Sequence, residues 1–137
     1  MAINPSFVAT PNNAHGAISG SIDPAGTLSW SAGSSGGMLR RVYVRAVADQ
    51  AVVVKIETRI GGTYALVAAV DVPVTPTGEL SSGLTPPFNI LNAQTFSGLS
   101  ESKGGLAFAA DDGIRVALDT VLDAGETCTI FCEGGDY

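Results

Sequence analysis

Apolar and polar residues alternate along several segments of the chain. Residues 52–60 (VVVKIETRI) place Val52, Val54 and Ile56 on one side and charged side chains such as Lys55 on the other. A period of two is typical of a strand that buries one face. The sequence therefore predicts a strand here, with one face in the core and one in water.

Other segments repeat this pattern. Residues 39–47 and 114–119 alternate in the same way, and Tyr64 and Leu66 begin an apolar face after the glycine pair at 61–62. Two adjacent glycines suit the positive φ angles of a tight hairpin turn. Short alternating strands separated by turns predict an all-β protein. We expect a single β-sandwich with jelly-roll topology.

Two segments lack this periodicity. Residues 1–15 contain prolines and asparagines that break regular elements, so we expect an irregular N-terminal arm followed by a β-sandwich domain at 16–137. Residues 71–105 are also dense in proline and glycine and predict a long loop region, a kind of segment that is often functional. The arm's apolar side chains Ile3, Phe7 and Val8 are candidate contacts with a partner.

Charge narrows the classes of partner. The net charge is −6 and the isoelectric point about 4.4, whereas nucleic-acid binding requires a basic surface. The N-terminus lacks the basic start and apolar core of a signal peptide, and no window approaches the ~20 apolar residues of a membrane span. We therefore expect neither nucleic acid nor a membrane as partner, and synthesis in a reducing cytoplasm.

The two cysteines predict buried thiols. Cys128 and Cys132 lie four residues apart in one predicted strand, roughly 13 Å at ~3.3 Å per residue. A disulfide needs Cα atoms within about 7 Å, so the two cannot pair with each other. Because they are an even number of residues apart, both thiols point to the same side of the strand, where cysteine can serve as a small apolar core residue. A metal site would need further ligands from elsewhere, and we expect no metal or other cofactor.

Candidate catalytic groups are few. His15 is the only histidine and falls in the expected arm, where no rigid triad geometry can form. Asp111 and Asp112 precede Gly113 without the spacing of a calcium loop, and a turn before a strand explains them better. We therefore expect a protein that is not an enzyme.

Basic and aromatic residues are the candidate interaction groups. Arg41, Arg45 and Arg59 belong to a set of strand-borne basic side chains that form either a solvated face paired with acids such as Glu57 and Asp119, or a docking surface for an acidic protein. Tyr43 is an aromatic candidate. Trp30 is either a core anchor or an interface residue, a position in which tryptophan is enriched.

The order of segments resembles small structural proteins of tailed bacteriophages. The resemblance lies in MLRRVYVRAV, the hairpin VVVKIETRIGGTYALV, the proline-rich VPVTPTG and TPPFNIL, the turn and strand ADDGIRVALD and the final TCTIFC. It implies a jelly-roll capsid cement or decoration protein of the virion, made in the host cytoplasm. Its partner would be the major capsid protein or another virion protein, and it would associate with itself, most often as a trimer.

Two alternatives stay open. The protein could serve in the tail, neck or baseplate of a phage instead of the head. It could also be a carbohydrate-binding β-sandwich, which would need exposed aromatic side chains, with Trp30, Tyr43 and Phe131 as the available candidates.

Overall fold

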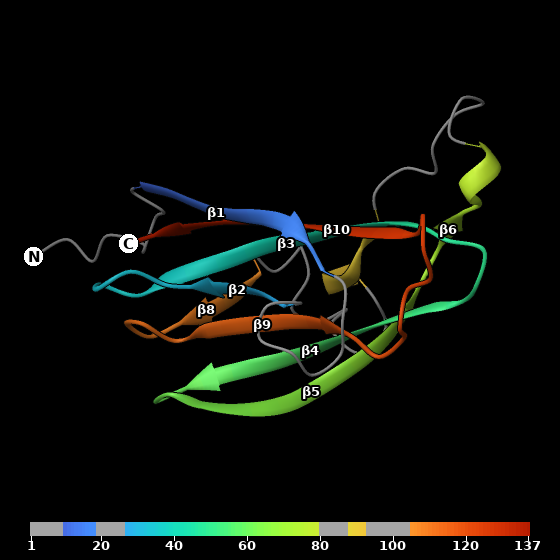
Figure 1. Ribbon diagram of the computed structural model, residues 1–137. Coiled ribbons are helices and arrows are strands. Elements are labelled where there is room, and N and C mark those ends of the chain that lie inside the picture. Colours follow the sequence, from blue (N-terminus) through green and yellow to red (C-terminus); the bar gives the residue numbers. More distant parts are fainter. Residues whose placement is uncertain (1–9, 19–26, 80–87, 93–104) are drawn as a thin grey trace, which may run out of the picture.

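The computed structural model describes residues 10–18, 27–79, 88–92 and 105–137. These residues form two β-sheets that pack face to face (Figure 1). The predicted all-β sandwich is confirmed, whereas its jelly-roll topology stays a prediction. The candidate contacts Ile3, Phe7 and Val8 lie outside the described residues.

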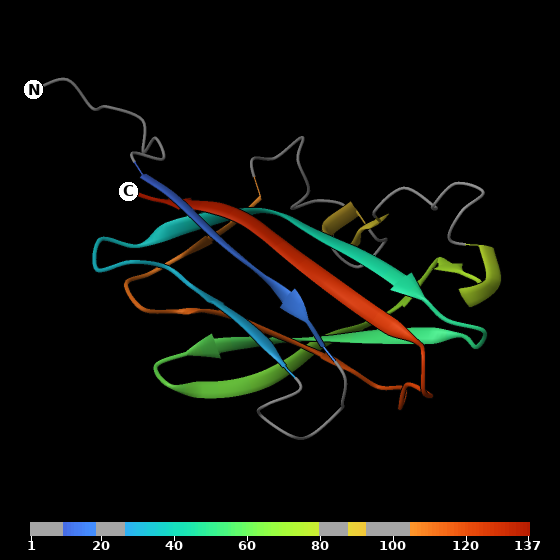
Figure 2. The same ribbon diagram turned by 45° about the horizontal axis from the view of Figure 1, so that its top comes forward.

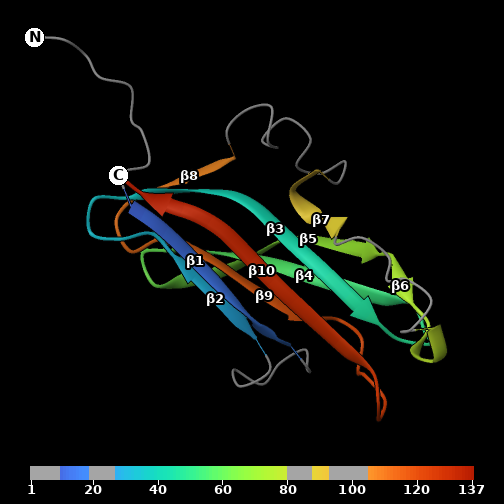
Figure 3. The ribbon, with the colours of Figure 1, turned by 90° about the horizontal axis from the view of Figure 1, so that it is seen from above.

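The larger sheet is built on three long antiparallel strands in the order β1, β10, β3. These are β1 (Thr10–Ala17), β10 (Thr127–Asp136) and β3 (Gly37–Val47). Three short strands pair in turn along the other side of β3: β8 (Leu106–Phe108), β7 (Phe88–Asn89) and the parallel β6 (Val74–Thr75). Figure 3 shows this sheet from above, with the long strands lying over the second sheet.

The smaller sheet is antiparallel, in the order β2, β9, β4, β5. Its strands are β2 (Leu28–Ser31), β9 (Gly113–Leu118), β4 (Val52–Ile60) and β5 (Thr63–Val72). Two 3-10 turns, η2 (Thr77–Glu79) and η3 (Ile90–Asn92), accompany the short strands. The glycine pair at 61–62 closes the β4–β5 hairpin with φ angles of 59° and 81°, as predicted.

The chain passes repeatedly from one sheet to the other (Figure 2). Residues 32–36 carry it from β2 to β3, residues 48–51 from β3 to β4, and residues 119–126 from β9 to β10. The strands joined by these three segments therefore lie in different sheets, and apart from the β4–β5 hairpin the long strands pair with strands distant in sequence. The outward side chains of β3 and β10 consequently form one surface.

The inward side chains of both sheets form one apolar core. It includes Val42, Val44, Ile130, Val54, Ile56, Val116 and Leu118, with Ile90 and Leu91 of η3. Cys128 and Cys132 are free and fully buried on the same face of β10, as predicted. Burial raises the pKa of each thiol to about 12. Both thiols therefore stay protonated at neutral pH and are poor nucleophiles.

The predicted boundary of the irregular arm is wrong. Residues 10–15 belong to β1, where they pair with β10 from Thr10 opposite Asp136 to His15 opposite Phe131. An edge strand can hold proline and asparagine because one side of its backbone needs no partner strand. The described part of the sandwich thus begins at residue 10, and only residues 1–9 of the expected arm lie outside the description.

The apolar face predicted after the hairpin turn is also displaced. Ile56 pairs with Ala68 but Glu57 pairs with Leu66, so Val67 is an extra residue, a β-bulge. The bulge reverses the alternation, which keeps Ala68 in the core and places Leu66 on the outer face beside Glu57. Leu66 is therefore 63% exposed.

Candidate binding face

Aromatic side chains line up across the outer face of the larger sheet. His15 pairs with Phe131, and Phe131 pairs with Tyr43, on three adjacent strands. The rings of His15 and Phe131 lie 6.3 Å apart between centroids. We call these three residues the aromatic rung. Phe131 is 38% exposed, so the rung offers ring surface to a partner.

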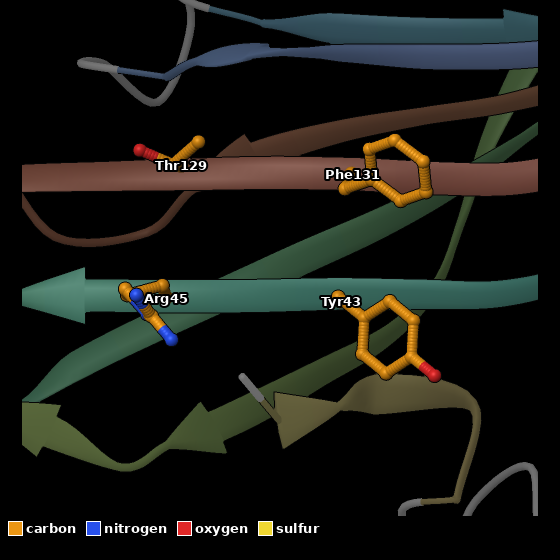
Figure 4. A pocket seen from close by; sticks show the side chains of 4 residues that line it. All are labelled: Tyr43, Arg45, Thr129 and Phe131. Atoms are coloured by element: carbon orange, nitrogen blue, oxygen red, sulfur yellow. The ribbon is translucent and has the colours of Figure 1, made fainter. Parts of the chain in front are cut away.

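A hollow of about 360 Å³ lies beside the rung. The described residues that line it are Tyr43, Arg45, Thr129 and Phe131, which form two adjacent cross-strand pairs of β3 and β10 (Figure 4). Because successive outward positions on a strand are two residues apart, these four side chains share one side of the sheet. The described lining combines two rings, two hydroxyls and one guanidinium.

Arg45 is the only charged side chain among those four. It is half-buried, and its Nε is shielded from solvent without a hydrogen-bond partner among the described residues. The nearest acid in the register, Glu133, is already paired with Arg41 at 3.1 Å. A partly buried guanidinium without a carboxylate partner is electrostatically unfavourable unless a ligand supplies one.

The basic side chains do not gather on one face. Arg41 and Arg45 lie on the larger sheet, whereas Lys55, Arg59 and Arg115 lie on the smaller. On the smaller sheet, Arg115 pairs with Glu57 at 2.6 Å and Lys55 with Asp119 at 3.6 Å, which are the two acids expected from the sequence. The smaller sheet therefore matches the solvated-face interpretation.

Arg59 and Trp30 both stabilise the fold through hydrogen bonds to backbone carbonyls. The Arg59 guanidinium donates to the Asp111 carbonyl at 3.0 Å and so holds the turn before β9. Trp30 is 1% exposed, and its indole Nε1 donates to the Asn12 carbonyl at 2.8 Å. Of the two interpretations of Trp30, the core anchor is confirmed, and the side chain is not accessible to a partner.

The aspartates before β9 form a turn, as predicted. Asp111 has a φ of 64°, a conformation that Asp tolerates better than most residues, and the Asp112 carboxylate accepts from the Gly61 backbone N–H at 3.0 Å. Within the described ranges, no three metal-ligating side chains converge on one point.

A second group of exposed apolar side chains lies at the end of the β4–β5 hairpin. Its members, which we call the hairpin cluster, are Ile60, Tyr64, Leu66 and Val67. β5 is an edge of its sheet, and its ten residues contain one charge and no proline. By contrast, the β1 edge carries Pro11 and two asparagines, and the β2 edge is only four residues long. Apart from the bulge at Val67 and the charge of Asp71, β5 thus lacks the features that protect edges from pairing.

Only part of the aromatic rung is visible in the sequence. The alternating pattern gives Tyr43 and Phe131 as outward aromatic residues, whereas the prediction that places His15 in an irregular arm is wrong. The rung depends on the pairing of β1 with β10, two strands at opposite ends of the chain. The sequence indicates the rung only through Tyr43 and Phe131, which both occupy outward positions in their alternating strands.

No family model, curated protein or solved structure matches this chain. Across the part of the chain that the structure describes, no helix has the length and apolar character to cross a membrane.

Proposed function

We propose that this protein is a structural virion protein, a capsid cement or decoration protein, that docks on the shell through the outer face of its larger sheet. The observation that supports this role is the exposed aromatic rung beside the half-buried Arg45. Tyrosine and arginine are enriched at the centres of protein interfaces. A rigid sheet also presents them in fixed positions, so little conformational entropy is lost on binding.

Attachment would be multivalent. Each copy contacts the shell through its rung, and copies joined to one another bind with an effective affinity well above that of a single contact. Residues 1–9, with Ile3, Phe7 and Val8, would extend the contact area. The protein would thereby join neighbouring shell subunits without chemical change.

Binding to shells of the parent particle tests this role. Replacing Tyr43 and Phe131 together with serine is expected to weaken binding at least about 30-fold, since interface hot spots contribute 2 kcal/mol or more. Co-sedimentation of purified protein with shells gives the affinity. Val121→Ser, at a position that is 72% exposed and outside the rung, is the control and should bind as wild type. Equal binding by the double variant would contradict docking through this face.

We further propose that copies associate through the hairpin cluster and the β5 edge. The chain has a net charge of −6, but beside this edge Lys55 and Arg115 are paired with Asp119 and Glu57, and β5 itself carries only the charge of Asp71. Two copies therefore repel each other little at this edge. The resemblance to decoration proteins implies three copies.

Leu66→Lys is expected to reduce the oligomer to a monomer, because it places a charge within the apolar contact without changing the core. Size-exclusion chromatography with light scattering gives the mass. Val121→Lys adds the same charge at an exposed site elsewhere and is expected to leave the mass unchanged. A wild-type chain that is monomeric at high concentration would rule out this interface.

Carbohydrate binding is a second candidate, supported by the hollow itself. Tyr43 and Phe131 offer ring faces for stacking on a sugar, with Thr129 and Arg45 as hydrogen-bonding groups. A glycan array distinguishes the two roles, because a cement protein has no need of a sugar ligand.

A further inference from the structure

We propose that the hollow beside Arg45 binds a carboxylate, and that the natural ligand is an acidic side chain of the shell protein. The inference rests on the proposed function for the identity of the partner. The carboxylate site itself follows from the residues of the hollow. Arg45 would pair with the acid, while Tyr43 and Phe131 would contact the apolar part of the same partner segment.

Arg45 has unmet hydrogen-bonding capacity within the described residues. A guanidinium carries five N–H donors and is charged at every physiological pH. The Arg45 Nε is buried without an acceptor among the described residues. The described side chains around the hollow offer the hydroxyls of Tyr43 and Thr129 and two aromatic rings, but no carboxylate. An anion is the ligand type that would complete this set.

Arg115 on the smaller sheet is an internal comparison for Arg45. Its guanidinium carbon lies 3.7 Å from the centre of the Tyr64 ring, and its Nη2 pairs with Glu57 at 2.6 Å. Arg115 thus has both an aromatic neighbour and a carboxylate, although its Nε, like that of Arg45, is buried without a hydrogen-bond partner among the described residues. Arg45 has aromatic neighbours at Tyr43 and Phe131, but no carboxylate of the described residues pairs with it. A bound acid would complete the same arrangement.

The shape of the guanidinium and the two rings favour a carboxylate over other anions. The planar fork of arginine matches a carboxylate with two parallel hydrogen bonds. The two rings favour a ligand whose carboxylate is attached to an apolar or flat group, as in a peptide. The chain has a net charge of −6 and therefore repels an acidic partner at long range. The attraction to such a partner comes only from short-range contact with the Arg45 guanidinium.

The test on the isolated protein uses hippurate, which joins a carboxylate to an amide and a ring, and its neutral analogue hippuramide. Two-dimensional ¹⁵N–¹H NMR monitors the Nε–Hε signal of Arg45. We expect hippurate to shift this signal in a saturable way and hippuramide to shift it at least tenfold less at equal concentration. Arg45→Gln should abolish the response of the Phe131 ring to hippurate, and Arg45→Lys should restore part of it. Equal shifts by both compounds, or no shift by either, would overturn the carboxylate site.

The identity of the partner is tested separately. Arg45→Gln should weaken shell binding at least tenfold, with Arg40→Gln, an exposed neighbour on β3, as the matched control that binds normally. If Arg45→Gln binds shells as wild type while the Tyr43 and Phe131 double variant does not, the acidic partner is wrong and the docking role stands. If wild type ignores shells but responds to hippurate, the docking role fails and the carboxylate site stands. A stronger response to glucuronate than to hippurate would assign the site to an acidic glycan and overturn the protein partner.

Discussion

Replacing Trp30 with alanine is expected to lower the free energy of unfolding by about 3–5 kcal/mol, the range for removing a buried large aromatic side chain. Trp30 is fully buried, and its ring centre lies 5.8 Å from that of Phe108. Its indole N–H donates to the Asn12 carbonyl, which ties β2 of the smaller sheet to β1 of the larger. The substitution thus removes both core packing and a contact between the sheets.

The loss is large relative to the total stability of a small domain, about 5–15 kcal/mol. Urea denaturation followed by far-UV circular dichroism measures it, since the variant lacks the only tryptophan and intrinsic indole fluorescence is lost. Trp30→Phe should lower the free energy of unfolding by less than Trp30→Ala, because it keeps ring packing and loses mainly the hydrogen bond. Val121→Ala, at an exposed position, should be neutral. A Trp30→Ala protein as stable as that control would show that Trp30 is not an anchor.

The long central strands could be predicted from the sequence because their pattern is local. β3 buries alternate residues from Val42 to Ala46 and β4 from Val52 to Ile56, so period-two alternation is visible there without knowledge of the partner strands. The unreactive state of Cys128 and Cys132 followed from the same parity. The sequence therefore predicts whether a strand residue points into the core or outward.

β1 could not be predicted because its stability comes from its partner. Its residues TPNNAHGA have little strand propensity, and the strand forms through pairing with β10, more than 100 residues away, as between Asn12 and Gly134. The bulge at Val67 could not be predicted either, because it is defined by the pairing of β5 with β4. The apolar residues of β5 are the same with or without the bulge. The aromatic rung required the β1 pairing, and the hairpin cluster required the bulge.

Gly113→Ala is expected to destabilise the protein by about 1–3 kcal/mol or more, the range for overpacking a tightly packed site. The sequence suggested that Gly113 belongs to a turn, but the structure places it at the first position of β9, paired with Ser31 of β2. A Cβ at this position would collide with the Trp30 carbonyl oxygen and would lie 2.8 Å from the Ser31 Cα. Both obstacles are backbone atoms, which cannot rotate away as a side chain can.

The added methyl group must therefore separate β2 from β9, and the Trp30 backbone moves with β2. Trp30 then serves as a probe in this variant, because loosening its pocket should shift indole emission to longer wavelength before global unfolding. Urea titrations followed by circular dichroism and by fluorescence measure the two effects. Gly78→Ala is the matched control, since a Cβ there meets nothing within 4 Å. If Gly113→Ala matches Gly78→Ala in both midpoint and emission, β2 and β9 do not approach as closely as described, and the contact of Trp30 with both sheets has to be reconsidered.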